Sequence, residues 1–76
     1  MKDRFTLKDG AAARPADLKQ DSVLFATNLE GTRFELRMDL SHKRVFNGER
    51  DVGTFFVNPF AMHAIEANLV DDWWKA

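Results

Sequence analysis

The 76-residue chain is 45% hydrophobic and 30% charged, and its formal net charge is −1. This balance predicts a single folded domain over residues 1–76, because disordered chains combine low hydrophobicity with high net charge. A nearly neutral chain is a poor general binder of polyanions, since affinity for phosphates grows with the number of basic contacts. Cysteine is absent, which excludes disulfides and thiolate metal sites, so we expect a cytoplasmic protein stabilised by packing alone.

Neither a signal peptide nor a membrane span is expected. The first ten residues, "MKDRFTLKDG", mix charges from the second position and lack an apolar core. The longest uncharged run, residues 53–65, is shorter than the roughly 20 residues that a membrane helix requires. It is also interrupted by Asn58-Pro59.

The first predicted element is an edge strand over "RFTLK", residues 4–8, in which apolar and polar residues alternate. The dipeptide Asp9-Gly10 is typical of a turn and should end this strand. The next stretch, residues 11–20, contains Pro15 and is compatible either with one helical turn or with a loop. We therefore predict only a connector there.

The clearest pattern is "TRFELRMDL", residues 32–40, in which apolar and polar residues alternate strictly. A period of two is that of a half-buried strand. The preceding "SVLFATNL", residues 22–29, is apolar and β-branched enough to be its hairpin partner. Glu30-Gly31 would lie in the turn between them.

Two registers of this hairpin differ in the side chains that face the core. A two-residue loop sets Phe25 opposite Leu36 and turns one set of side chains inward: Val23, Phe25, Thr27 and Leu29. A three-residue loop would turn Leu24 and Ala26 inward instead. We favour the two-residue loop, because it gives the more coherent apolar face.

Farther along the chain, Asn47-Gly48 is the strongest two-residue hairpin signal. It predicts short strands at residues 44–46 and 49–52. The following "GTFFV", residues 53–57, has the composition of a further strand. These strands together would form an antiparallel meander.

The last predicted element is a helix from Pro59 to about Trp74. Asn58 is a good N-cap residue, and proline is favoured at the first helical position. The predicted fold class is therefore α+β. It consists of a small antiparallel meander sheet of about four to five strands, with one C-terminal helix packed on its apolar face.

At about 100° per residue, the apolar side chains of this predicted helix fall on two arcs. The first arc is a core stripe: Ala61, Met62, Ile65, Leu69 and Trp73. The second arc adjoins it: Phe60, His63, Ala67, Val70 and Trp74. It either covers the sheet edge or the connector at residues 11–20, or forms an exposed apolar patch rimmed by Asp71, Asp72 and Lys75. Fraying of the last helical turn is the third alternative.

No group of residues predicts catalysis or metal binding. Asp39, Ser41 and His42 include the residue types of a nucleophilic triad, but they sit almost consecutively at a strand end, which favours a solvated turn. His63 and Glu66 have a spacing that can share a metal, yet a third ligand is missing. We therefore expect no enzyme activity, no metal and no cofactor.

The function that the sequence favours is a protein-binding or inhibitory module acting through the second helix arc. The expected contact residues are Phe60, His63, Val70, Asp71, Asp72 and Trp74. Tryptophan is enriched at the centres of protein interfaces. A homodimer formed through the same patch is the competing interpretation.

Nucleic-acid binding through the outer face of the sheet is the alternative function. The residues for this role are Arg33, Arg37, Lys43 and Arg44. Glu35 and Asp39 alternate with the arginines, which favours cross-strand ion pairs over phosphate contacts. No aromatic residue is expected on that face to stack on a base. We therefore rank nucleic acid below a protein partner.

Overall fold

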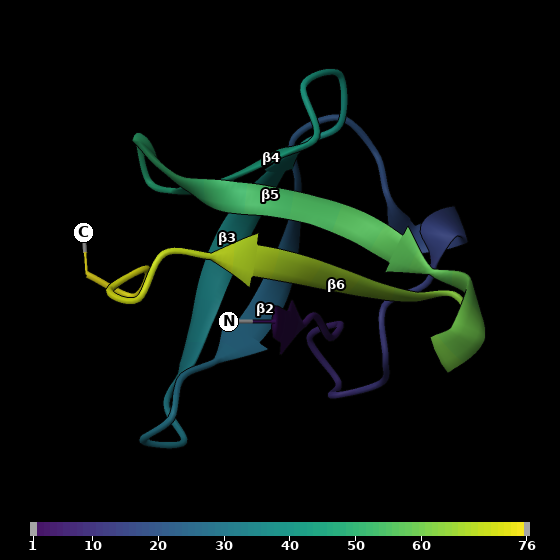
Figure 1. Cartoon of the computed structure of the whole chain (residues 1–76), viewed down its shortest axis with the longest axis horizontal. Helices are drawn as coiled ribbons and strands as arrows, with labels where there is room; N and C mark the ends of the chain where they lie inside the picture. Colours follow the sequence, from purple (N-terminus) through teal and green to yellow (C-terminus); the bar gives the residue numbers. More distant parts are fainter. Residues whose placement is uncertain (1, 76) are drawn as a thin grey trace.

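The computed structural model describes residues 2–75 and consists of one curled antiparallel sheet (Figure 1). Its strands are β1 (Lys2–Arg4), β2 (Ser22–Thr27), β3 (Arg33–Asp39), β4 (Arg44–Asn47), β5 (Arg50–Asn58) and β6 (Ala64–Leu69). They lie in the order β1-β6-β5-β4-β3-β2. Helical structure in the described part is limited to two short 3-10 turns, η1 (Pro15–Asp17) and η2 (Pro59–Ala61).

The sheet curls into a half-barrel, and the segment that follows β1 closes it by bonding to β6 and then to the opposite edge strand, β2. The N–H of Phe5 donates to the carbonyl of Ile65 in β6 at 3.0 Å. The next residue, Thr6, exchanges two backbone hydrogen bonds with Phe25 of β2, at 2.8 and 2.9 Å. The two ends of the sheet order are thereby brought together around the core.

The core fills the inside of this half-barrel with side chains from all of its longer strands. Its buried members are Phe5, Ala13, Leu24, Ala26, Leu36, Met38, Val45, Val52, Phe55, Ile65, Ala67, Leu69 and Trp73. The strand predicted at residues 32–40 is confirmed as β3, and its alternate residues Leu36 and Met38 face this core. The predicted meander is confirmed for β2 to β5, and β6, which was not predicted, extends it.

The predicted helix from Pro59 to Trp74 is wrong, and with it the α+β fold class. Its start is correct, since Asn58 accepts a hydrogen bond from the Phe60 N–H at 3.0 Å and Pro59 begins η2. The turn then ends because Met62 and His63 adopt left-handed backbone angles, with φ of 56° and 60°. The chain continues as β6, so the described protein is nearly all β.

Tertiary pairing explains why residues 64–69 form a strand although alanine, glutamate and leucine favour helices. This segment lies between β5 and β1 and pairs with both. Backbone groups on both sides of β6 are thereby satisfied. The carboxylate of Glu66, which is buried, accepts hydrogen bonds from Asn58 at 3.1 Å and from Arg4 at 3.4 Å.

The favoured register of the β2–β3 hairpin is also wrong. Leu24 pairs with Leu36, and Leu24 and Ala26 are buried, whereas Val23 faces outward. The rejected three-residue loop is therefore the one that forms.

The chemistry of the β2–β3 turn sets this register. The side-chain oxygen of Asn28 accepts hydrogen bonds from the N–H groups of Glu30 and Thr32, at 3.1 and 2.9 Å. Gly31 has φ of 85°. A three-residue hairpin loop requires a left-handed residue at this position, and glycine adopts it without steric cost.

The predicted β4–β5 hairpin is confirmed, with its turn displaced by one residue. Asn47 pairs with Arg50, so Gly48 and Glu49 form the loop. The strands predicted at residues 49–52 and 53–57 are one strand, β5, which carries a bulge near Val52. The edge strand predicted at residues 4–8 is shifted toward the N-terminus, and the following turn at Gly10 is confirmed.

Candidate functional site

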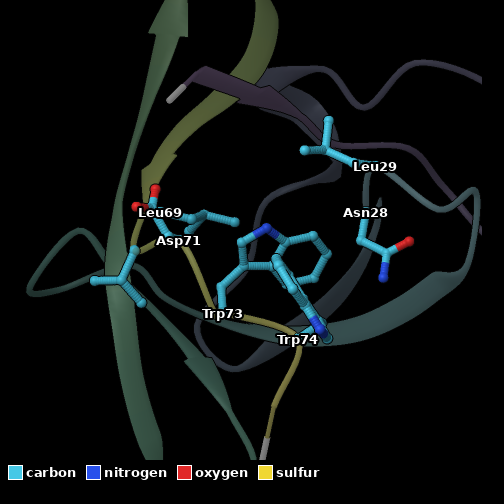
Figure 2. A pocket seen from close by; sticks show the side chains of 7 residues that line it. Asn28, Leu29, Leu69, Asp71, Trp73 and Trp74 are labelled. Atoms are coloured by element: carbon cyan, nitrogen blue, oxygen red, sulfur yellow. The ribbon is translucent and has the colours of Figure 1, made fainter.

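An apolar pocket of about 320 Å³ opens at the end of the half-barrel where β6 finishes (Figure 2). One wall comes from the C-terminal turn after β6, and the other comes from the loop between β2 and β3. The lining residues are Asn28, Leu29, Leu69, Val70, Asp71, Trp73 and Trp74. Two segments that lie 40 positions apart in the sequence, at Leu29 and Leu69, therefore build one site.

Two tryptophans form the floor and one side of this pocket. The Trp73 side chain is only 2% exposed and packs edge-on against Phe34, with ring centroids 5.6 Å apart. Trp74 is partly buried and stands at 87° to Trp73, with a centroid distance of 5.8 Å. Perpendicular aromatic rings at this distance stabilise each other. The pair forms a fixed apolar corner.

The backbone of the C-terminal turn is held by hydrogen bonds from the rest of the sheet. The Asn47 side chain donates to the Trp73 carbonyl at 2.9 Å. Arg50 donates to the carbonyls of Asp72 and Lys75, both at 3.0 Å, and to the Asp72 carboxylate at 2.6 Å. The hydrogen bond from Arg50 lowers the pKa of Asp72. These contacts position the indoles without a helix.

Exposed aliphatic side chains lie around the pocket. Leu29 is 83% exposed and Val70 is 44% exposed. Asp71, on the same rim, is exposed and makes no hydrogen bond or ion pair within residues 2–75. Apolar groups gathered around a concave surface and edged by charge are typical of interaction sites.

The structure separates the six residues predicted to contact a partner. Val70, Asp71 and Trp74 line the pocket, and Asp72 lies in the same turn. Phe60 and His63 lie beyond the other end of β6, which is a six-residue strand about 20 Å long. The predicted single helix arc therefore does not exist.

The sequence interpretation missed the wall opposite the tryptophans. Leu29 and Asn28 belong to the hairpin loop, and their role depends on a register that we had not favoured. One signal was available, because a bulky apolar residue between Asn28 and Glu30 is unusual in a turn.

The tryptophans themselves follow the sequence prediction more closely. Trp73 belongs to the core together with Ile65 and Leu69, as predicted. Trp74 was expected either to cover the sheet edge or to be exposed. It does neither completely, since it packs on the core and also lines an open pocket.

The basic set proposed for nucleic-acid binding is engaged within the chain. Arg37 pairs with Asp21 at 2.8 Å, and Arg44 pairs with Asp51 through two guanidinium nitrogens at 2.8 and 2.9 Å. The bonds between Arg44 and Asp51 lower the pKa of the aspartate and raise that of the arginine. Arg33 donates to the carbonyls of residues 7 and 8, at 2.9 and 2.6 Å.

The expectation that this face lacks aromatic residues is wrong. The corrected register turns Phe25 outward, and the Arg33 guanidinium lies 4.4 Å from the centre of its ring. Arg37 lies 4.3 Å from the centre of Phe46 in the same way. Lys43, the fourth member of the basic set, lies 6.0 Å from the ring of Phe55. The phenylalanines on the outer face are therefore covered by the arginines.

Asp39, Ser41 and His42 form a turn cap whose geometry differs from that of a catalytic triad. The Asp39 carboxylate accepts from Ser41 Oγ at 3.0 Å, and it lies 3.0 Å from His42 Nδ1. Gln20 donates to the same carboxylate at 3.0 Å. In a triad the histidine stands between the other two residues, but within the described residues Ser41 Oγ bonds the aspartate.

This cluster predicts an acid-dependent loss of stability. The hydrogen bond from Gln20, with those from His42 and Ser41, lowers the pKa of Asp39 below its ordinary value of 3.8. A lowered pKa stabilises the fold above the ordinary pKa, and that contribution is lost as the pH falls below it. The Asp39→Asn variant should therefore be less stable than wild type at neutral pH.

The pH dependence of the melting temperature checks this prediction. Between about pH 5 and pH 2, the melting temperature of wild type should fall further than that of Asp39→Asn. Asp51 and Asp72 also have lowered pKa values, but they are present in both proteins, so the difference isolates Asp39. Parallel curves for the two proteins would contradict the assignment.

Two further observations concern metals and membranes. No group of three or more His, Cys, Asp or Glu residues that could hold a metal ion occurs within residues 2–75. His63 and Glu66 do not share one helix face, as their spacing would require for a common metal ion, because both residues lie outside any helix. Of the two, only Glu66 is buried. In the described part of the chain, no helix has the length and apolarity that crossing a membrane requires.

Comparison with known proteins gives this chain no relative from which a function could be transferred. No family model matches it, and no curated protein or solved structure matches it with statistical significance. The function is therefore argued from the pocket and from the surfaces around it.

Proposed function

We propose that the chain is a small cytoplasmic protein-binding module that accepts an apolar side chain of its partner in the pocket beside Trp73 and Trp74. The observation that carries this proposal is the pocket's composition. An exposed leucine, Leu29, faces two perpendicular indoles across an open apolar space (Figure 2). Covering these groups would remove apolar surface from water, which is the main driving force of association.

The size of the pocket favours a protein side chain as its occupant. Sites for small molecules span roughly 300 to 1,000 Å³, and this pocket, at about 320 Å³, is at the lower end of that range. It has room for one large side chain of a partner, with Leu29 and Val70 forming a contact surface around it. A buried anchor surrounded by such a rim is the usual arrangement of interface hot spots.

A matched pair of substitutions tests the pocket. Peptides selected from a random display library on the wild-type protein should quench its tryptophan fluorescence. Leu29→Asp should weaken their binding at least about tenfold, because it places a charge in the apolar wall. Val23→Asp is the control, since Val23 is an exposed apolar residue on the outer sheet face. Peptides that bind Leu29→Asp as tightly as wild type would refute the proposal.

Nucleic-acid binding has less support. The outer face does carry aromatic rings, but each of its three arginines is already held by a carboxylate or by backbone carbonyls. Binding a phosphate would require breaking those contacts first. Retention on heparin that falls with increasing salt would favour this function over the pocket.

A further inference from the structure

The second unusual surface of the protein is the tip formed by residues 59–63, between β5 and β6. Phe60 is 98% exposed and Met62 is 75% exposed. Because almost none of the Phe60 side chain is buried, it contributes almost no hydrophobic stabilisation to the fold of its own chain. Of the large hydrophobic side chains that are exposed in the described structure, Phe60 has the greatest exposed fraction.

The backbone of this tip is nevertheless held in place. Asn58 accepts a hydrogen bond from the Phe60 N–H at 3.0 Å, and the Arg14 guanidinium donates to the Met62 carbonyl. Met62 and His63 are consecutive residues with left-handed backbone angles, a conformation that is unfavourable for residues with a Cβ atom. Such backbone persists only where its surroundings hold it, and it is often found at binding sites. The tip therefore presents Phe60 in a defined position.

The pocket and the tip lie at opposite ends of the molecule. They flank β6, whose first residue follows the tip and whose last residue, Leu69, lines the pocket. Figure 1 shows η2 and the C-terminal turn at the two ends of the long axis, which measures 29 Å. A single copy cannot place its own Phe60 in its own pocket. A second copy can.

The charges at the two ends are complementary. Asp71 on the pocket rim and Glu30 beside Leu29 make no ion pair within residues 2–75. At the tip, Arg14 has no carboxylate partner for its guanidinium within the same residues. Asp71 and Glu30 therefore border the pocket, with Lys75 in the same C-terminal turn as Asp71. The Arg14 guanidinium lies at the Met62 carbonyl of the tip. Attraction between these carboxylates and this guanidinium would orient two copies head to tail.

From these observations we infer that the protein associates with itself head to tail, with Phe60 of one copy seated in the pocket between Leu29 and Trp74 of the next. This inference rests on the proposed function, because it names the side chain that fills the same pocket. A phenylalanine side chain is small enough for a pocket of about 320 Å³. Each contact leaves one tip and one pocket free, so association continues past the dimer unless it closes into a ring.

Sedimentation and light scattering of the full chain test this inference. Wild type should increase in average mass between micromolar and millimolar concentration and pass beyond a dimer. Phe60→Ser and Leu29→Asp should each lower the association constant at least about tenfold, as the loss of a central anchor does. Both residues are exposed, so the variants should remain folded. Val23→Ser is the matched control and should associate like wild type.

Mixing the two defective variants gives the sharper result. The Phe60→Ser protein keeps an intact pocket, and the Leu29→Asp protein keeps an intact tip. An equimolar mixture should therefore form a dimer and stop there, although each variant alone stays monomeric. A two-fold symmetric dimer through the pocket predicts no such complementation. Absence of a dimer in the mixture, or a wild type that stays monomeric, would overturn the inference.

The proposed function remains separately testable. The peptides selected for the pocket should bind the Phe60→Ser variant with unchanged or higher affinity, because its pocket is intact and does not compete with a neighbouring tip. Peptide binding without self-association would refute the head-to-tail contact and leave the protein-binding pocket standing. Loss of peptide binding only in Leu29→Asp, together with complementation in the mixture, would support both.

Discussion

Replacing Trp73 by alanine is expected to lower the free energy of unfolding by about 3 to 5 kcal/mol. The indole is 2% exposed, packs edge-on against Phe34 and closes the core at the pocket end of the half-barrel. Domains have a total stability of roughly 0.05 to 0.15 kcal/mol per residue. The loss is therefore a large part of the whole, and a substantial fraction of the variant should be unfolded at room temperature.

Urea denaturation followed by circular dichroism measures this loss, with Trp74→Ala as the matched control. Trp74 is only partly buried, so its replacement should cost about 1 to 2 kcal/mol. If Trp73→Ala does not fold, Trp73→Phe provides a milder change at the same position. Equal costs for the two alanine variants would mean that the indoles contribute alike to the core, which contradicts the structure.

The strands of this protein could be predicted where each one buries a single face. Alternation over residues 32–40 identified β3, and the signals around Asn47-Gly48 identified the β4–β5 hairpin. These patterns depend on side chains that point alternately into and out of the core. They do not specify which residues of neighbouring strands pair.

The register of β2 depended on contacts that a pattern of hydrophobic residues does not contain. Both registers bury apolar side chains, so the hydrophobic pattern alone could not decide between them. The register is fixed by the hydrogen bonds that the Asn28 side chain accepts and by the left-handed backbone of Gly31. A three-residue loop that ends in glycine is itself a hairpin signal. It favours the observed register, which turns Leu29 toward the pocket.

The helix was predicted wrongly because local propensity and tertiary pairing disagree over residues 64–69. The segment "AIEANL" favours a helix in isolation. In the fold it fills the gap between β1 and β5, two partners that lie more than 40 residues apart in the sequence. The sequence of this segment does not indicate that it pairs with β1 or with β5. Of the residues that line the pocket, the sequence prediction consequently included only Val70, Asp71 and Trp74. These three residues come together in the C-terminal turn without a helix.

A second large effect is expected at Gly53, next to the bulge that β5 carries at Val52. The register between β4 and β5 shifts here, since Val45 pairs with Gly53 but Phe46 pairs with Asp51. Gly53 has φ of 153° and pairs with Leu69 of β6 on its other side. The bulge allows one strand to bend between two neighbours, and bulges of this kind increase the local twist of a sheet.

Gly53→Ala should therefore cost about 4 kcal/mol or more and prevent the half-barrel from forming under ordinary conditions. An added Cβ atom would overlap the Asn68 carbonyl oxygen and lie 2.9 Å from the Leu69 Cα atom. Both are backbone atoms of β6, so they can yield only if the pairing of β5 with β6 breaks.

The control for Gly53→Ala is Gly48→Ala, which makes the same chemical change in another left-handed glycine. Gly48 has φ of 63°, and nothing lies within 4 Å of an added Cβ atom there. Only the conformational cost of about 1 to 2 kcal/mol should remain. Urea denaturation, or the dispersion of amide resonances if Gly53→Ala does not fold, distinguishes the two variants. Equal losses would show that backbone angle alone governs Gly53, whereas a much larger loss at Gly53 shows that the close approach of β5 and β6 shapes the half-barrel.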